Sequence, residues 1–268
     1  MFVRISEFTR VFWSSAVLAK NALFNWLSPA MWIMQLFSIS LFQIAFFVYV
    51  TKYVQNPDIS VTYVAIGNAL QSIAYVTVFA VCNITGEEKQ QGTLVPILST
   101  PANRMAMFIG RAMFQIVNGI ATAMIALLYA AFLFGVDFSH TDMLALGVVI
   151  VITAFAMTGF GLMLSSVGLY LRTSMIIANI FLFIGLLFCG VNFPVSYLPG
   201  YLQPISYCIP MTFGTDAARA AVDGTSLLGI SGTIGLELLV GLAALFLGYL
   251  MFTLFENLSR KRGTMDRY

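Results

Sequence analysis

Long apolar stretches constrain the fold of this chain more than any other feature. Six of them approach or exceed the roughly 20 residues that a helix needs to cross about 30 Å of hydrocarbon. They cover residues 26–50, 62–84, 105–134, 143–171, 174–193 and 227–255. Backbone polar groups must be satisfied inside lipid, and the stretches lack the period of two of barrel strands, so they predict helices. Only 9% of the residues are charged, against about 25% in soluble domains, so we expect an all-α polytopic membrane protein with six transmembrane helices.

The basic residues are distributed unevenly between the two sides of these spans. Of the 13 lysines and arginines, only Lys52 and Arg219 fall on the side opposite the termini. The positive-inside rule therefore predicts that both termini are cytoplasmic. A net charge of +2, without basic clusters interleaved with aromatic residues, argues against a nucleic-acid partner.

The segment before the first span has apolar residues at helical spacing, among them Phe8, Phe12 and Ala16, with polar residues roughly opposite. This pattern predicts an amphipathic helix at the membrane interface over residues 1–25, followed by a single transmembrane domain over residues 26–268. The alternative is that the segment simply begins the first span. Its apolar run is too long for a secretory signal, and no cleavage site follows promptly.

Prolines break the apolar segment between the fifth and sixth spans. They recur every five or six residues, at Pro194, Pro199, Pro204 and Pro210, so no piece is long enough to cross the bilayer. We expect short external helices that re-enter or lie on the outer leaflet. A further short helix follows, in which Arg219 is three residues from Asp216 and four from Asp223. This segment is either an external cap or ordinary loop packing.

The sequence GEEKQQGTLVPILSTP, residues 86–101, is a dense polar patch between two apolar spans. Its first residues extend the second helix beyond the membrane, and Gly92 suits the left-handed position that ends a helix. Thr93 can then cap a short helix, which we expect to have an apolar face containing Leu94, Ile97 and Leu98. An exposed apolar face outside the membrane suggests a protein partner.

Two motifs in the chain resemble those of ABC-2-type exporter permeases. The first is the loop pattern of an acidic pair, Gly-Thr-Leu, leucine, Ser-Thr-Pro and arginine, present here as Glu87, Glu88, Gly92, Thr93, Leu94, Leu98, Ser99, Thr100, Pro101 and Arg104. The second is the external segment with Phe193, Pro194, Leu198, Pro199, Leu202, Gln203, Pro204, Tyr207, Pro210 and Thr212. The six-span layout is also similar. Pro96 departs from the pattern, since many members carry a helix former there.

The resemblance implies a transport subunit in the plasma (inner) membrane of a prokaryote. Such a permease pairs with a second permease chain, the same or homologous, and binds cytoplasmic ATPase subunits through a coupling helix. The implied ATPase contacts are Glu87, Glu88, Gly92, Thr93, Leu94, Ile97 and Leu98. No lysine follows a glycine, so the 268 residues contain no G-x-x-x-x-G-K-[ST] phosphate loop, and ATP and Mg²⁺ would bind to the partner. We expect no catalytic, cofactor-binding or metal-binding residue in this chain.

Polar residues within the spans are candidates for a translocation path. Asn68, Gln71, Ser72 and Tyr75 share one face of the second span, and polar side chains in lipid face protein or a cavity. The alternative is hydrogen bonding to the third span, where Gln115, Asn118 and Thr122 have the same spacing. Gln35, Gln43 and Asn179, in the first and fifth spans, are candidates by the resemblance alone.

Glu237 is the one acidic residue inside an apolar run, and counting back from the end of the sixth span places it at the interface. It is either a solvated or arginine-paired carboxylate or a group with a substrate or proton role. Small residues on the same helix, including Gly241 and Gly248, and Gly161 on the fourth predict close helix packing.

The expected function is ATP-driven outward transport of an amphipathic substrate, such as a drug, an antibiotic or a lipid-linked compound, by alternating access. Export of a polysaccharide or glycolipid by the same machinery is the alternative. A membrane-embedded enzyme is disfavoured because no acid, histidine or cysteine cluster lies at one depth. A passive channel is disfavoured because a charged ring or filter-like loop is missing.

Overall fold

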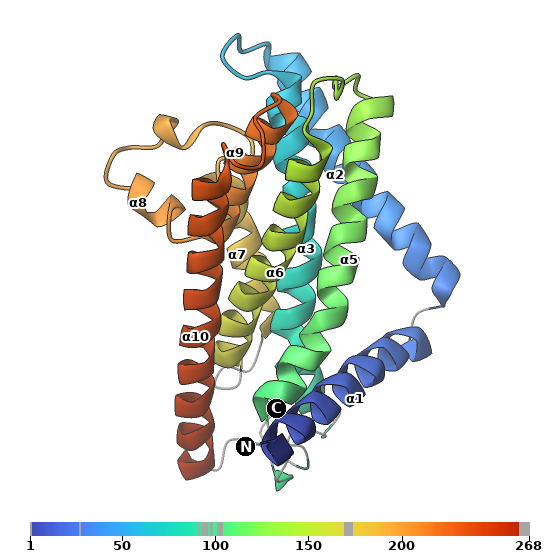
Figure 1. The fold of residues 1–268 in the computed structure, drawn as a ribbon, viewed down its shortest axis with the longest axis vertical. Coiled ribbons are helices and arrows are strands. Elements are labelled where there is room, and N and C mark those ends of the chain that lie inside the picture. The colour runs from blue at the N-terminus through green and yellow to red at the C-terminus, as the bar shows by residue number, and fades with distance from the viewer. Residues whose placement is uncertain are drawn as a thin grey trace.

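The computed structural model describes residues 2–26, 28–90, 92, 96, 99–100, 104–168 and 174–262. Within these residues the protein consists of nine α-helices and one short 3-10 helix. They are α1 (Phe2–Trp26), α2 (Pro29–Val54), α3 (Val61–Gln90), α5 (Arg104–Phe132), α6 (Met143–Gly168), α7 (Ser174–Phe188), η1 (Val195–Tyr197), α8 (Gln203–Ser206), α9 (Pro210–Val222) and α10 (Ser231–Arg262). Figure 1 shows a bundle with α8 and α9 toward one end, here called the α9 end. Helix α1 and the last turns of α10 lie at the opposite, terminal end.

Five of the helices are long and apolar enough to cross a membrane. Their apolar stretches are Pro29–Val54, Val61–Ile84, Ala106–Phe132, Met143–Val167 and Ser231–Phe255. These stretches coincide with five of the six predicted spans to within a few residues. The first begins later than predicted because Ser28 caps a new helix: its hydroxyl accepts a hydrogen bond from the Met31 amide, and Pro29 takes the first helical position.

The predicted fifth span is shorter than expected. Helix α7 has 15 residues and ends at Phe188, whereas the prediction continued to residue 193. At about 1.5 Å per residue this helix covers about 22 Å, less than the roughly 30 Å of a hydrocarbon core. The chain leaves the helical path at Gly190, whose φ of +65° lies in the left-handed region.

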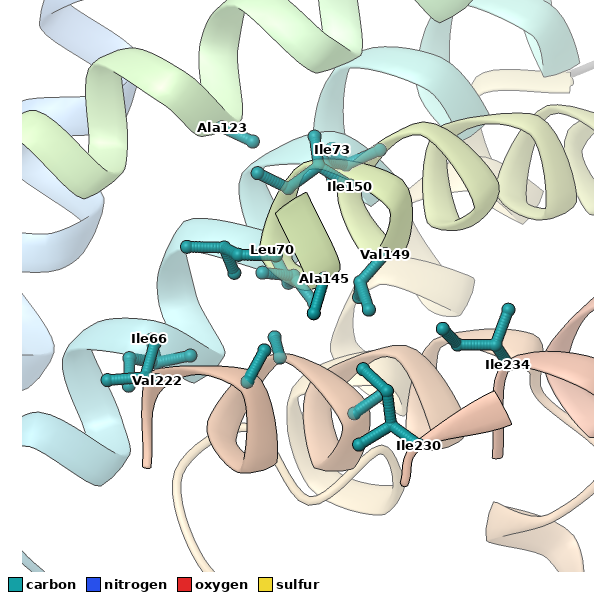
Figure 2. Packing of buried hydrophobic residues seen from close by; sticks show 14 of the residues in the cluster. Ile66, Leu70, Ile73, Ala123, Ala145, Val149, Ile150, Val222, Ile230 and Ile234 are labelled. Atoms are coloured by element: carbon teal, nitrogen blue, oxygen red, sulfur yellow. The ribbon is translucent and has the colours of Figure 1, made fainter. Parts of the chain in front are cut away.

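Helix α3 lies at the centre of the bundle. It packs against α2, α5, α6, α7 and α9, whereas α10 packs on α6 and α9. The largest hydrophobic core fills the α9 end of the bundle, and Figure 2 shows how its side chains meet. Ile66 and Leu70 of α3, Val149 of α6, Val222 of α9 and Ile234 of α10 all belong to it. Ala123 of α5 belongs to it as well, so this core joins the short helix α9 to four of the long ones.

Small residues allow the long helices to approach closely, as predicted. A Cβ atom at Gly241 of α10 would lie 2.6 Å from the Cβ of Ala156 on α6, and one at Gly248 would lie 2.9 Å from the Cα of Met163. A Cβ at Gly161 of α6 would lie 3.1 Å from the Cβ of Val81 on α3. At Gly241 and Gly248 a Cβ would force a neighbour to shift, and at Gly161 it would make a tight contact. Such close backbone approach supports helix association in lipid.

The proline-rich segment after α7 forms short elements, as the proline spacing predicts. The 3-10 helix η1 has three residues and α8 has four, and neither could cross a membrane. Helix α9 begins with Pro210 in its first turn, where the missing N–H costs no helical hydrogen bond. Most of α9 is buried against α3, α6 and α10.

Candidate functional site: the polar face of α3 and the loop that follows it

Helix α3 continues beyond its apolar stretch at the terminal end of the bundle. The stretch ends at Ile84, whereas the helix ends at Gln90, six residues or about 9 Å further on. Gly92 then adopts a φ of +67°, which confirms its predicted role as the left-handed residue that ends a helix. The side chains of Glu87 and Glu88 and the residues Thr93, Leu94, Ile97 and Leu98 lie outside the described residues.

Three of the candidate path residues are buried inside the chain. Asn68 and Ser72 are 0% exposed and Gln71 is 2% exposed. The amide nitrogen of Asn68 donates to the side-chain oxygen of Asn192 at 2.8 Å, beyond the end of α7. The amide nitrogen of Gln71 faces the backbone oxygen of Leu182 in α7 at 3.4 Å. The polar face of α3 therefore bonds to α7 and the segment after it.

The polar stripe of the third predicted span has other partners. The amide of Asn118 donates to Gln115 on its own helix at 3.0 Å. The hydroxyl of Ser40 in α2 reaches the backbone oxygen of Thr122 at 3.2 Å. Among the hydrogen bonds of the described residues, none joins the stripes of α3 and α5. These helices meet by packing, because Gly119 leaves room for the methyl group of Thr77.

The other candidate path residues lie on the outside of the isolated chain. Gln35 is exposed and Gln43 is half-buried on α2. Tyr75 is 40% exposed and stacks on Phe79, with ring centroids 6.1 Å apart. Asn179 is exposed on α7 and donates only to the backbone of its own helix, at Met175. The structure thus divides the predicted path residues into a buried group on α3 and an exposed group on α2, α3 and α7.

Arg219 of α9 has contacts that sequence spacing did not predict. Its Nη1 lies 3.6 Å from Oδ1 of Asp216. Its other nitrogens donate to backbone oxygens in α3 and in the chain just after α7. They reach Tyr63 at 3.2 and 3.3 Å, Gly190 at 2.8 Å and Val191 at 3.1 Å. The guanidinium carbon also lies 3.4 Å from the centroid of the Tyr63 ring, a cation–π geometry. The one sequence signal for this role is that Arg219 is one of two basic residues predicted on its side of the membrane.

The charge of Arg219 is held in a mostly buried position, with its side chain 11% exposed. Burial lowers the pKa of Arg219 from its usual value, while Tyr63 and Asp216 act in the opposite direction. Because an arginine guanidinium is not deprotonated in proteins, the group remains a cation with donors only. It therefore supplies charge-assisted hydrogen bonds to carbonyl groups that the end of α7 leaves without helical partners.

Glu237 is not the solvated carboxylate that the sequence offered as one alternative. Its side chain is 0% exposed, and its Oε1 accepts a hydrogen bond from the Thr153 hydroxyl at 2.6 Å. A Cβ at Gly214 of α9 would lie 2.5 Å from both oxygen atoms of this bond. Counting residues back from the end of the span gave the position of Glu237 along α10, but it could not show which side of the helix the residue lies on. The side chain points inward, toward α6 and α9.

No group of three or more histidine, cysteine, aspartate or glutamate side chains that could hold a metal ion occurs among the described residues. Of the three cysteines, Cys82 and Cys189 are buried and Cys208 is exposed, and none of the three is in a disulfide.

The chain is similar to known membrane transport proteins. The family model for ABC-2 type transporters matches residues 14–222. A probable multidrug ABC transporter permease, YbhR, from Escherichia coli K12 is 26% identical over 166 residues, which is 61% of this chain and 45% of the relative. The protein of the same name from Escherichia coli O157:H7 matches equally well. The chain thus spans less than half the length of these relatives. Because the family match covers most of the chain, this protein belongs to the ABC-2 type transporter family, as a multi-pass membrane permease without a phosphate-binding loop in its 268 residues.

Proposed function

We propose that this chain is the membrane subunit of an ATP-driven exporter in the plasma (inner) membrane of a prokaryote. Two permease chains, identical or homologous, would bind separate cytoplasmic ATPase subunits that carry ATP and Mg²⁺. ATP binding would move the permeases to an outward-open state, and hydrolysis would reset them. The observation that carries this proposal is the family match together with the extension of α3 to Gln90, followed by the left-handed Gly92.

The orientation of the chain follows from its charges. The terminal end contains α1, the last turns of α10, the end of α3 and the start of α5, and most lysines and arginines lie in or next to these segments in the sequence. We place this end in the cytoplasm. Helix α7 is then a sixth, shorter crossing, and η1 and α8 lie in or on the outer leaflet. Helix α1 packs across α5 and lies at the inner interface.

Exposed apolar faces support a second permease chain as a partner. On α2, Met34, Phe42 and Phe46 are 61–71% exposed, and on α7 Phe183 is 71% exposed. Tyr75 of α3 and Asn179 of α7 are exposed as well. Lipid covers such faces in a single chain, and a second subunit would bring the exposed path residues together around a shared route.

The substrate class is the most specific part of this proposal. The candidate path residues are polar but uncharged, and the relatives are named as probable multidrug permeases. We therefore favour an amphipathic drug, antibiotic or lipid-linked compound. A polysaccharide or glycolipid handled by the same machinery is the second candidate.

The coupling loop is tested by Leu94→Asp, with Thr141→Asp near the opposite end as the control. Burying a leucine at an interface contributes roughly 1.5–3 kcal/mol, and a buried unpaired charge costs several kcal/mol more. We expect Leu94→Asp to abolish capture of the cognate ATPase and efflux of a fluorescent amphipathic dye, while membrane insertion is unchanged. Glu87→Gln should act more weakly, because charges at an interface rim contribute little. Full ATPase binding and full efflux by Leu94→Asp would show that the loop is not a coupling helix.

A further inference from the structure

The contact between α3 and α7 is polar at the α9 end of the bundle, unlike the apolar contacts around it. We call this contact the outer seam. It is formed by Gly67, Asn68 and Gln71 of α3, Leu182 and Gly185 of α7, and Gly190, Val191 and Asn192 beyond α7. Three hydrogen bonds cross it directly: Asn68 to Asn192 at 2.8 Å, Gln71 to Leu182 at 3.4 Å and, at the α9 end, the Tyr63 hydroxyl to Gly190 at 2.9 Å.

Glycines bring the two sides of the outer seam together. A Cβ atom at Gly67 would collide with the backbone oxygen of Val191, so α3 and the chain after α7 touch backbone to backbone. A Cβ at Gly185 would lie 3.3 Å from the Gln71 amide nitrogen, which shows that the amide lies against bare backbone. Leu182 and Val191 of the seam also belong to a hydrophobic core, so the polar contacts lie beside packed apolar side chains.

Arg219 closes the outer seam at its α9 end. From α9 it donates to Tyr63 at the start of α3 and to Gly190 and Val191 just after α7. Through these bonds one guanidinium group contacts both the start of α3 and the chain just after α7. No bond of comparable charge joins α3 to α7 among the described residues.

Polar groups within the outer seam are buried without full hydrogen bonding. The side-chain oxygens of Asn68 and Gln71 and the Nη1 of Arg219 have no hydrogen-bond partner. These are three of the seven such buried atoms in the described part of the chain. A buried acceptor without a donor carries an energetic cost, and opening of the seam would remove that cost by admitting water or a ligand.

We propose that the outer seam is the external gate of the permease, with Arg219 as its latch. In the closed state, Arg219 holds the outer ends of α3 and α7 together and hides Asn68 and Gln71. When Arg219 releases Gly190 and Val191, the ends separate and the two amide side chains face the route of transport. This inference rests on the proposed transport function and deepens it.

The gate also favours one chemical class of cargo. The opened seam would present the carbonyl oxygens of Asn68 and Gln71, which accept hydrogen bonds, beside apolar helix faces. A neutral amphipathic molecule with N–H or O–H groups satisfies these acceptors, whereas a strong cation would meet Arg219 at the exit. This accounts for the burial of path residues in a closed permease.

The latch is tested in the resting chain by labelling a cysteine at Asn68→Cys with an impermeant maleimide from outside. The background replaces Cys82 and Cys189 with alanine and Cys208 with serine. We expect slow labelling when Arg219 is present and labelling about tenfold faster or more with Arg219→Met, because loss of charge-assisted hydrogen bonds shifts the opening equilibrium by at least that factor. Arg219→Lys should give an intermediate rate, since it keeps the charge but donates from one nitrogen.

The control is Ala65→Cys, which lies one turn away on α3. Ala65 is 0% exposed and packs on the α2 and α5 side, away from the outer seam. Its labelling should stay slow in both backgrounds. The latch is refuted if Arg219→Met leaves Asn68→Cys labelling unchanged, or if it accelerates Ala65→Cys equally, which would indicate general unfolding.

The gate is tested by adding the cognate ATPase and a non-hydrolysable ATP analogue to the Asn68→Cys permease. We expect the nucleotide to accelerate labelling at this position and not at Ala65→Cys. If the ATPase binds but the nucleotide changes neither rate, the seam is not the gate, and the proposed exporter function still stands. If the ATPase does not bind at all, it is the proposed function that fails, while the resting-chain result still decides whether Arg219 is a latch.

Discussion

The hydrogen bond between Thr153 and Glu237 joins two helices deep in the molecule. The donor and acceptor are 84 residues apart in the sequence, and Oε2 of Glu237 has no hydrogen-bond partner. Gly214 of α9 lies directly against the pair, so a third helix excludes other donors from it. The Thr153 hydroxyl is therefore the one hydrogen-bond donor to this carboxyl group among the described residues.

Thr153→Val tests how much this bond stabilises the fold. The substitution keeps the shape of the side chain but leaves a fully buried carboxyl group without a donor. We expect it to lower the free energy of unfolding by about 1–3 kcal/mol. Thr153→Ser, which keeps the hydroxyl, should lose less. The measurement is thermal unfolding of the purified permease in detergent.

Thr158→Val is the matched control for this experiment. Thr158 is also buried on α6, but its hydroxyl bonds only to the backbone oxygen of Ala154 in its own helix. That oxygen keeps its helical partner when the hydroxyl is removed, so we expect little change. Equal losses for Thr153→Val and Thr158→Val would mean that the bond to Glu237 contributes nothing specific.

The environment of Glu237 shows what the sequence could and could not predict for single residues. Hydropathy identified the helix and the approximate depth of the residue, because both depend on neighbours along the chain. Its buried orientation depends on Thr153 and Gly214, which come from two other helices. The same holds for Arg219, since sequence spacing predicts partners only on its own helix.

Helix α7 shows the corresponding limit for secondary-structure elements. Residues 189–193 continue the apolar pattern, so hydropathy predicted a helix to residue 193. Irregular backbone is tolerated at membrane depth only where protein satisfies its polar groups. Arg219 satisfies the carbonyls of Gly190 and Val191, and Tyr63 donates its hydroxyl to Gly190 at 2.9 Å. The apolar pattern gives no sign of these distant donors, whereas the proline-broken segment and the end of α3 at Gly92 carry local signals and were predicted correctly.

The packing of α10 on α6 depends on Gly241. A Cβ atom there would lie 2.6 Å from the Cβ of Ala156, and the Ala156 Cα is only 2.8 Å away. Gly241→Val must therefore push the two helices apart, and overpacking of this kind costs typically 1–3 kcal/mol. We expect a lower unfolding temperature in detergent and a smaller yield of folded protein.

Gly235→Val is the control for Gly241→Val because it lies on the same helix. A Cβ at Gly235 would meet nothing within 4 Å, so valine there should be tolerated and should benefit slightly from replacing a glycine in a helix. If both substitutions lower stability equally, a general preference of α10 for glycine would account for the loss, and the contact with Ala156 would not.

The arrangement of the whole molecule follows from the alternation of helices between its two ends. The loops around His140 and Gly200 lie opposite the end of α3, and both residues are exposed. Charge counting predicted which loops share a side, because loop charges determine how a chain inserts. It could not predict that α9 would be buried against α3, α6 and α10, since that contact depends on surfaces formed only in the assembled bundle.

The orientation in the membrane is tested by single cysteines in a Cys208→Ser background, which removes the exposed native thiol. We expect cysteines at His140 and Gly200 to react with an impermeant maleimide added to sealed cells. A cysteine at Gln90, at the end of α3, should react only after the cells are permeabilised. The physical reason is that lysines and arginines are retained on the cytoplasmic side, and most of those in this chain fall on the same side as the termini. Labelling of Gln90→Cys in sealed cells, with His140→Cys protected, would reverse the orientation. It would place the loop after α3 on the outside, where no cytoplasmic ATPase could bind it.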